Sequence, residues 1–394
     1  MSRTVIDLHV LQTVPPSNVN RDDTGSPKTA VFGGVRRARV SSQAWKRAAR
    51  LAFSDLLDRE NLGTRTKRIV EVVAERVTAS RPDLAGRAPS LAEGVVRGTG
   101  IELEKATRTR SGAEPVEVQQ SKYLVFLSHL QLDQLAAKAV EIADAPDPEA
   151  AMKAFKGKEG KDLLKRDHSV DLALFGRMVA DDKDLSVDAC AQVAHAISVH
   201  GIDNEFDYFT AVDDEKGDDE DAGAGMIGTV EFNSSTLYRY ATVDVDRLRD
   251  NLGDDEATRR AVEAFIQAFV TSMPTGKQNT FANRTLPDVV VVTARDSQSV
   301  NLVGAFEDPV TAENGTPRAT VAARRLARRA VEVSEVLGQR PVATWALAVG
   351  DARTGLEDVW DADRAEDLRL SWTTLPALAS SVGDVVAARA GAPR

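Results

Sequence analysis

The residues best suited to bind an anion are concentrated near the N-terminus. Between residues 24 and 54 the sequence has no Asp or Glu and carries seven basic residues: Lys28, Arg36, Arg37, Arg39, Lys46, Arg47 and Arg50. The 394-residue chain has a net charge of −10, but binding depends on the local field and not on this average. From Asp213 to Asp221 the balance is reversed, with seven acids and only Lys216 against them. The first segment could therefore hold a polyanion, and the second would repel one.

The segment that follows Ser41-Ser42 is predicted to be a helix that presents part of this charge. Ser41 and Ser42 are suitable N-caps, and the helix N-terminus adds a partial positive charge. At 100° per residue one side is apolar and carries Trp45, Ala48, Ala49 and Ala52. The opposite side carries Gln43, Lys46, Arg47 and Arg50. A solvated basic face without a ligand is the alternative interpretation, and the acid-free surroundings make it the less favoured one.

The sequence contains none of the common motifs that would indicate an enzyme. A GxxxxGK[ST] phosphate loop, a GxSxG elbow and an HExxH zinc motif are all missing. His195 and His200, with Asp203 downstream, could form a metal site, but structural histidines are the favoured interpretation. Asp22-Asp23 fits a polar loop. Cys190, the only cysteine, fits a small core residue and cannot form a disulfide within the chain. We therefore expect no catalysis, no metal and no other cofactor.

Regular elements that could position these residues are predicted from periodicity. Strands are expected at residues 4–11, where Pro15-Pro16 ends the strand, and at 229–243, 288–293 and 341–349. Helices are expected after Ser41-Ser42 and at 256–273, 318–338 and 374–390, and residues 64–180 favour a helical insertion. The β-prone segments on either side of the acidic run predict a long hairpin. This β-α-β-β-α-β order is that of ferredoxin-like RNA recognition domains, so the predicted class is α+β.

Neither a membrane segment nor a secretory leader is predicted. No apolar run approaches the roughly 20 residues that span a bilayer. The N-terminal residues MSRTVIDLHVLQTV lack the basic region, apolar core and cleavage site of a signal peptide. A cytoplasmic location is the resulting expectation, and it agrees with the single cysteine.

The run from Ile6 to Arg50 resembles the CasC family, the backbone subunit of the type I-E CRISPR Cascade complex. Later motifs follow in the family's order: LALFGRM (172–178), AHAISVH (194–200), DYFTAVDD (207–214), YRYA (238–241) and GKQNTFA (276–282). The similarity extends from the first strand to about residue 293. One departure is Val35, which stands where many members have a basic residue.

The resemblance implies a right-hand shape. An RRM-type, ferredoxin-like palm would comprise residues 1–60 and 181–394, with helical fingers at 61–180 and a thumb hairpin at 200–243. Several copies would line the guide RNA, each holding its backbone without reading sequence, while the thumb kinks out a nucleotide. The exposed bases would then pair with target DNA. The implied partners are the crRNA, target DNA by way of the crRNA, other copies of the chain and other Cascade subunits, with no membrane.

The resemblance and the basic segment together predict a set of RNA-binding residues: Asn20, Lys28, Arg36, Arg37, Arg39, Ser41, Gln43, Lys46, Arg47, Arg50, Arg177, Met178 and Lys277. The predicted thumb residues are Tyr208, Phe209, Thr210 and Val212. Two other functions remain open at this point. The chain could be a free-standing regulator that binds single-stranded RNA, or a metal-dependent nuclease that uses Asp22, Asp23 or His200.

Overall fold

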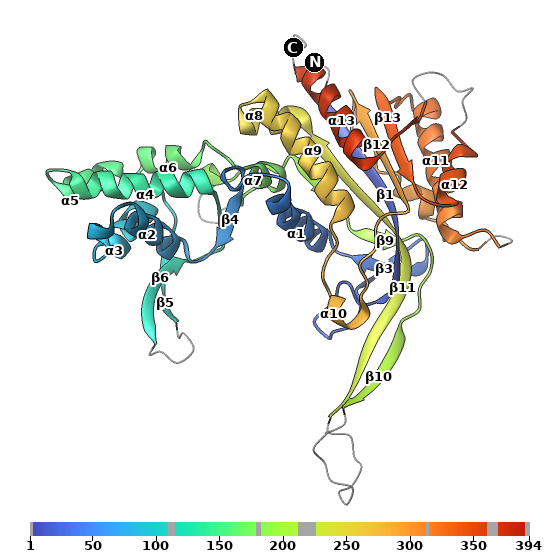
Figure 1. Ribbon diagram of the computed structural model, residues 1–394, viewed down its shortest axis with the longest axis horizontal. Helices are drawn as coiled ribbons and strands as arrows, with labels where there is room; N and C mark the ends of the chain where they lie inside the picture. Colours follow the sequence, from blue (N-terminus) through green and yellow to red (C-terminus); the bar gives the residue numbers. More distant parts are fainter. Residues whose placement is uncertain are drawn as a thin grey trace, which may run out of the picture. The chain divides into compact units, whose positions relative to one another are not determined.

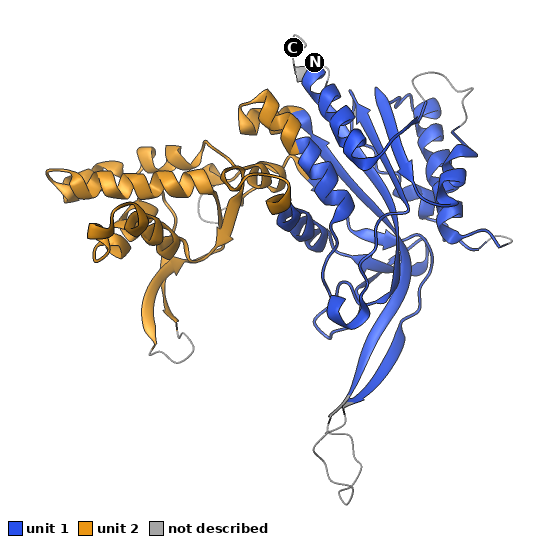
Figure 2. Ribbon diagram, viewed as in Figure 1, with its two compact units in different colours: residues 1–52, 192–245, 262–394 blue, residues 53–191, 246–261 orange. Residues whose placement is uncertain are grey.

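The computed structural model divides the chain into two compact units (Figure 2). It describes residues 3–108, 115–178, 183–211, 226–312, 315–360 and 369–390. Unit 1 comprises residues 1–52, 192–245 and 262–394, and unit 2 comprises residues 53–191 and 246–261. The segment 61–180, predicted as a helical insertion, falls within unit 2. The acidic run, with Val212, lies outside the described residues.

Unit 1 is built on a large, mostly antiparallel sheet with the strand order β14-β13-β12-β1-β11-β9-β3-β2 (Figure 1). Strands β8 and β10 also pair with β11. The bounds are β1 Val5–Ser17, β2 Thr29–Phe32, β3 Val35–Val40, β8 Ala191–Val193, β9 Ala196–Ser198, β10 Glu205–Ala211, β11 Met226–Asp244, β12 Val289–Arg295, β13 Ala343–Ala348 and β14 Ser371–Trp372. The sheet and its helices make this a mixed α+β fold, as predicted.

Strand β1 lies at the centre of the sheet and is longer than predicted. It pairs with β11 from Val5 to Val14 and again at Ser17, and with β12 from Val5 to Leu11. The expectation that Pro15-Pro16 ends the strand was wrong, because β1 continues to Ser17. A register shift between Val14 and Ser17 places the prolines at an irregularity, where the ladder does not require the N–H that proline lacks.

Helices cover both faces of this sheet. They are α1 Ser42–Ala52, α9 Asp255–Thr271, α10 Gln278–Phe281, α11 Arg318–Val336, α12 Ala352–Glu357 and α13 Leu375–Ala390. On one face, Leu326 and Ala327 of α11 belong to the same core cluster as Leu11 and Val291 of the sheet. On the other face, Trp45 of α1 packs with Leu237 of β11. Apolar residues at helical spacing on α11 and α1 therefore bury one side of each helix.

Unit 2 has its own helical core and two short β-ribbons. Its helices are α2 Ile69–Ser80, α3 Ala88–Gly98, α4 His129–Asp144, α5 Pro148–Phe155, α6 Lys158–Leu164, α7 Val170–Phe175 and α8 Val245–Leu252. The ribbons are β4 Gly63–Thr66 with β7 Val125–Ser128, and β5 Leu103–Arg108 with β6 Val116–Ser121. The prediction of a helical insertion missed both ribbons, because strands of four to six residues are too short to establish a period of two.

Candidate nucleic-acid interface

Helix α1 turns its basic side outward because Trp45 anchors the other side in the core. The Trp45 side chain is 1% exposed. The guanidinium of Arg239, on β11, lies 3.7 Å from the Trp45 ring centroid and 4.5 Å from that of Phe269. It donates to Gln12 Oε1 at 2.6 Å and to the Phe269 carbonyl. This stack of Trp45, Arg239 and Phe269 fixes the rotation of α1 against the sheet.

The outward side of α1 carries the four residues predicted from the sequence. Gln43 and Arg47 are exposed, and Lys46 and Arg50 are partly buried. Within the described part of the chain, Lys46 and Arg47 have no carboxylate partner, whereas Arg50 interacts with a neighbouring group. Burial lowers the pKa of Lys46, because a charged group that loses water is destabilised. A bound anion would offset this cost, so the side is suited to bind phosphate.

The loop of residues 18–28 closes back onto the start of α1. Asn20 Oδ1 accepts the Ser41 amide at 2.8 Å, and the Asn20 carbonyl accepts the Lys28 amide at 2.9 Å. The Lys28 carbonyl in turn accepts the Arg39 amide at 2.9 Å. Asn20, Lys28 and Arg39 line a shallow pocket with two polar residues of β11, Asn233 and Ser235. Residues that are far apart in the sequence thus form one polar, basic surface.

His195 lies at the start of α1, close to the charges of Arg39 and Lys28. Its Nδ1 accepts the Ser42 amide at 3.2 Å, which satisfies one of the free N–H groups at the start of α1. Burial lowers the pKa of His195, and the charges of Arg39 and Lys28 lower it further. His195 is therefore a neutral part of the helix start, held next to two cations.

Two predicted RNA-binding residues, Arg37 and Arg177, are buried in the structure, contrary to the prediction. The Arg37 side chain is 0% exposed and donates to the carbonyls of Phe32, Ser198, Phe306 and Glu307 at 3.0–3.2 Å. Arg177, in unit 2, is also buried and donates to three carbonyls: Leu185, Phe126 and Leu164. Both guanidiniums bind buried backbone and are not available to phosphate. Arg36, by contrast, is exposed.

The hairpin of β10 and β11 exposes aromatic side chains on both of its faces. The register pairs Tyr208 with Thr229 and Phe209 with Gly228, so the two rings point to opposite faces, as adjacent residues of a strand do. Tyr208 is 62% exposed and Phe209 is 37% exposed. The Phe209 ring covers Gly228, where an added Cβ would lie 2.4 Å from the ring. Thr210 is exposed beside them, and Val212 lies outside the described residues.

Three further positions lie at the surface. Met178, at the end of the LALFGRM motif in unit 2, is 85% exposed, so its side chain is not packed in a core. Lys277 adopts a left-handed backbone conformation next to Gly276, whose missing Cβ allows close approach to the Val19 carbonyl. Arg284 was missed by the sequence reasoning. It is exposed, and no partner is present among the described residues. Its position directly after the GKQNTFA motif could have indicated it.

Two of the residues proposed for the nuclease alternative, His200 and Asp22, are engaged in other contacts. His200 Nδ1 donates to the Gly201 carbonyl at 2.7 Å, and its Nε2 accepts the Thr236 amide at 3.1 Å and Arg318 at 3.2 Å. Burial lowers the His200 pKa to about 4. The Asp22 carboxylate accepts from Thr24 and Ser26 at 2.7–3.0 Å. Among the described residues no cluster of three His, Cys, Asp or Glu side chains could hold a metal.

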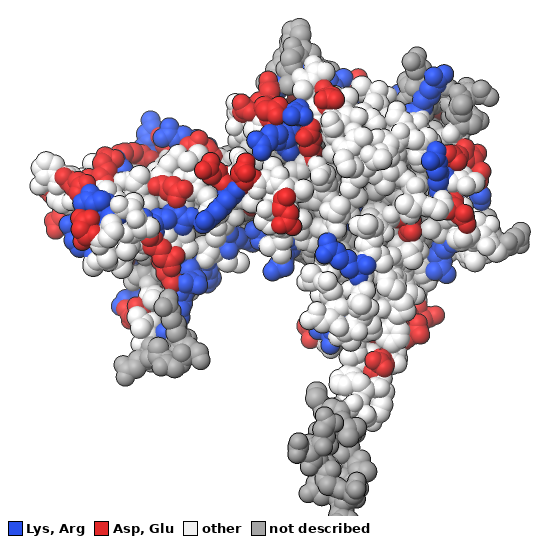
Figure 3. Space-filling view, in the orientation of Figure 1, with Lys and Arg blue, Asp and Glu red and all other residues white. Residues whose placement is uncertain are grey.

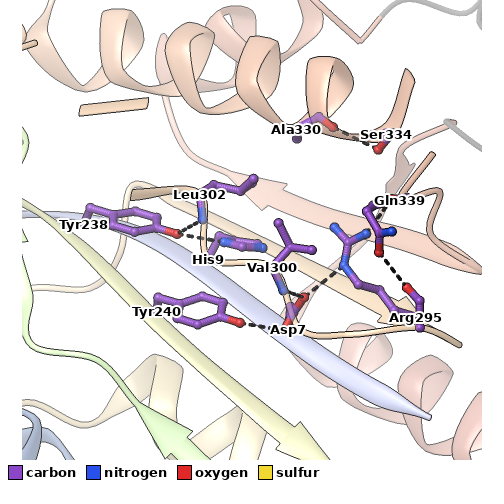
Figure 4. Close-up of polar contacts among 11 residues, drawn as sticks. Asp7, His9, Tyr238, Tyr240, Arg295, Val300, Leu302, Ala330, Ser334 and Gln339 are labelled. Atoms are coloured by element: carbon purple, nitrogen blue, oxygen red, sulfur yellow. Dashed lines mark hydrogen bonds and ion pairs between the residues drawn. The ribbon is translucent and has the colours of Figure 1, made fainter. Parts of the chain in front are cut away.

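A second group of ionisable residues is buried on the face of the sheet that α11 covers (Figure 4). The Asp7 carboxylate accepts from Tyr240 at 2.8 Å, Arg295 at 2.9 Å and the Val300 amide at 2.9 Å. His9 Nδ1 lies 2.9 Å from the Tyr238 hydroxyl, and burial lowers the His9 pKa to about 3. The cavity beside His9 has room for little more than a water molecule. These buried groups join β1, β11 and β12 and are not a surface for nucleic acid.

Cys190 is buried, in agreement with the prediction of a small core residue. Its sulfur accepts from Asn251 at 3.1 Å. Among the described helices, none combines the length and the apolar composition that a bilayer-spanning segment needs.

The fold and this surface define a mixed α+β chain with a basic helix side and an aromatic hairpin. The chain belongs to the family described as CT1975-like protein, whose model matches residues 6–371. It is similar to a chain in the solved structure titled "CRISPR RNA-guided surveillance complex, pre-nicking", with a TM-score of 0.78 and 34% identity over 97% of this chain and 100% of that one. A chain titled "CRISPR RNA-guided surveillance complex" gives a TM-score of 0.68 and 29% identity over 97% and 99%.

The comparison with curated proteins gave no match. The family match and the two solved structures confirm the resemblance to a Cascade protein family that was recognised from the sequence motifs.

Proposed function

We propose that this chain is the non-catalytic subunit that binds the guide RNA backbone in a type I-E CRISPR Cascade complex. Several copies line one crRNA without reading its sequence, in contact with one another and with other Cascade subunits. The crRNA bases stay exposed and pair with target DNA, so that base pairing supplies the specificity.

The observation that carries the proposal is a set of unpaired cations on unit 1. Lys28, Arg36, Lys46 and Arg47 have no carboxylate partner among the described residues. Asn20 and Gln43 add neutral hydrogen-bonding groups beside them. Cations and amides of this kind contact phosphate and sugar, which are the same at every nucleotide. They therefore support binding that does not depend on sequence.

We assign unit 1 as an RRM-type palm, unit 2 as the fingers and the β10–β11 hairpin as the thumb. Tyr208 and Phe209, on opposite faces of the hairpin, can each stack against a base, as can the exposed Met178. Stacking accepts any base because every base has a flat apolar face. Because each copy contributes one hairpin, the bound RNA would be kinked at regular intervals.

The salt dependence of binding tests the proposal. We expect single-stranded RNAs of different sequence to bind the full chain with similar affinity and with cooperativity that increases with RNA length. The double variant Lys46→Ala/Arg47→Ala should weaken all sequences alike. The negative slope of log K against log salt should become shallower by about 1.4, because each phosphate contact on a single strand contributes about 0.7 to its magnitude.

The matched control is Lys153→Ala/Lys156→Ala, which removes two exposed lysines of unit 2, one in α5 and one directly after it, and should leave the RNA slope unchanged. An unchanged slope in the α1 variant would show that this side of α1 is only solvated. Non-cooperative binding of one preferred sequence would instead favour a free-standing regulator. RNA cleavage that stops on addition of a chelator would favour the nuclease.

A further inference from the structure

The base of the β10–β11 hairpin is fastened to the loop of residues 18–28 by Glu231. One carboxylate oxygen of Glu231 accepts the Ser26 hydroxyl at 2.9 Å, and the other accepts the Asn204 side-chain amide at 3.1 Å. The Glu231 carbonyl accepts the side-chain amide of Asn18 at 2.9 Å, and the same amide reaches the Gly25 carbonyl at 2.9 Å. Three chain segments therefore meet at one residue.

The opposite face of the hairpin base is held as well, by different contacts. Phe232, next to Glu231 and so on the other face of β11, lies 5.8 Å from Phe281 of α10, measured between ring centroids. The turn before α10 is pressed against the same loop, because Gly276 approaches the Val19 carbonyl. Glu231 on one face and Phe281 on the other thus hold the hairpin base between the two loops.

A carboxylate is an unexpected residue at this place. The loop it holds carries Asn20 and Lys28. A negative charge beside phosphates bound there would repel them and weaken RNA binding. Glu231 uses both of its oxygens in hydrogen bonds, whereas Glu205, across the hairpin from Phe232, is exposed and has no partner among the described residues.

We propose that Glu231 is a positioning residue that couples the RNA-binding loop of residues 18–28 to the hairpin. By holding Ser26 and Asn204 together, it sets the hairpin's direction relative to Lys28. The phosphate contacts and the stacking aromatics then act on the same stretch of RNA. This proposal rests on the proposed function, since it assigns Glu231 a part in RNA binding.

The test compares Glu231→Ala with Glu231→Gln and Ser26→Ala in the full chain, using a labelled uridine homopolymer that holds several copies. Glu231→Ala should bind about tenfold more weakly, as expected when hydrogen bonds to a charged group are removed. Glu231→Gln keeps an acceptor for Ser26 and should recover much of the loss. In the double variant with Ser26→Ala, the loss should be smaller than the two single losses added together, because both act through one hydrogen bond.

The matched control is Glu205→Ala, which removes an equal charge from the other face of the same hairpin and should bind RNA as well as or better than the wild type. If Glu231→Ala also bound as well or better, Glu231 would be an electrostatic bystander and the proposal would be overturned. Additive losses for Ser26→Ala and Glu231→Ala would overturn it too, because the two residues would then act independently.

Hydrogen exchange without RNA separates this proposal from the proposed function. The Asp22 and Lys28 amides are bonded inside the loop, to Ser26 and Asn20, and both should exchange faster in Glu231→Ala while the amides of β1 stay protected. Unchanged exchange at these two amides would contradict the positioning role. Failure of the wild-type chain to bind RNA would contradict the proposed function and leave the exchange result intact.

Discussion

Unit 2 and the basic segment of unit 1 carry similar cations in different electrostatic surroundings. In unit 2, carboxylates pair with Arg76 at 2.7 Å, Arg81 at 2.8 Å and Arg97 at 3.0 Å. Figure 3 shows the result on one face, where basic and acidic side chains are mixed over the helices of this unit. In the basic segment, Lys28, Arg36, Lys46 and Arg47 have no such partner among the described residues.

The difference separates two uses of a positive charge. A paired surface cation contributes little to stability and leaves little field for a ligand. An unpaired group of cations repels itself in the free protein and keeps its field for an incoming anion. A third use is represented by Arg37 and Arg239, whose charges are buried among carbonyls and aromatic rings.

The largest expected effect is the loss of stability when a buried arginine is replaced. Arg37→Ala should lower the free energy of unfolding by about 3 kcal/mol or more, because it leaves several buried carbonyls without a donor. Its exposed neighbour is the control. Arg36→Ala should leave stability almost unchanged and weaken RNA binding instead. Denaturant titration and RNA binding of both variants check this, and equal stability of the two would contradict the assignment of Arg37 as structural.

Acid should destabilise the sheet before it breaks the surface pairs. Burial lowers the pKa of His9 to about 3 and that of His200 to about 4, from an ordinary 6.5. The unfolded chain therefore takes up protons first, so stability is complete above about pH 6.5 and falls toward pH 4. Each histidine contributes up to about 1.4 kcal/mol per pH unit.

The surface pairs respond at a lower pH. Hydrogen bonds from Arg68 and then Arg108 lower the pKa of Glu71 to about 2, so its contribution is present above about pH 4.5 and is lost only below it. Unfolding free energies measured between pH 7 and 5 should therefore decrease, and should decrease less in His9→Asn. A flat profile would contradict the neutral, buried state of these histidines.

Two exposed side chains, Met178 of unit 2 and Phe209 of the β10–β11 hairpin, should affect RNA binding without affecting stability. Met178→Ala removes a side chain that is 85% exposed, so thermal stability of the free chain should hold. Assembly on RNA should weaken by about 1–3 kcal/mol if the side chain stacks on a base. Phe209→Ala should behave similarly. A loss of stability near the 2–5 kcal/mol of an emptied core site would refute the stacking role.

The smallest effect is expected for a paired cation of unit 2. Arg97→Ala breaks an i,i+4 pair with Glu93 and should change stability by only about 0.3–0.5 kcal/mol. The slope of RNA affinity against salt should stay the same. A reduced slope would show that unit 2 also takes part in binding the RNA backbone and would weaken the comparison.

The sequence predicted the parts of the site that depend on local periodicity. Trp45 and the alanines of α1 predicted which side of this helix is buried. Charge alone could not distinguish Arg36 from Arg37. That distinction depends on the carbonyls of Phe306 and Glu307, some 270 residues away, and on tertiary packing that no local pattern encodes.

The role of Glu231 could not be predicted from the sequence for the same reason. Its partners Ser26 and Asn204 come from two other segments, and an acid in a hairpin is ordinarily solvated. The end of β1 was predicted wrongly because proline usually interrupts a ladder. Only the register shift against β11 shows how the strand passes Pro15-Pro16.

The central position of β1 has a consequence for the synthesis of the chain. Both of its neighbours come much later, since Val5 pairs with Asp244 of β11 and with Arg295 of β12. At roughly 5–20 residues per second, the ribosome needs on the order of ten seconds or more to produce them. During this time the apolar residues Val5, Ile6, Leu8 and Val10 of β1 have no strand beside them. We therefore expect the nascent N-terminus to depend on chaperones, and the late arrival of β11 to limit the rate of folding.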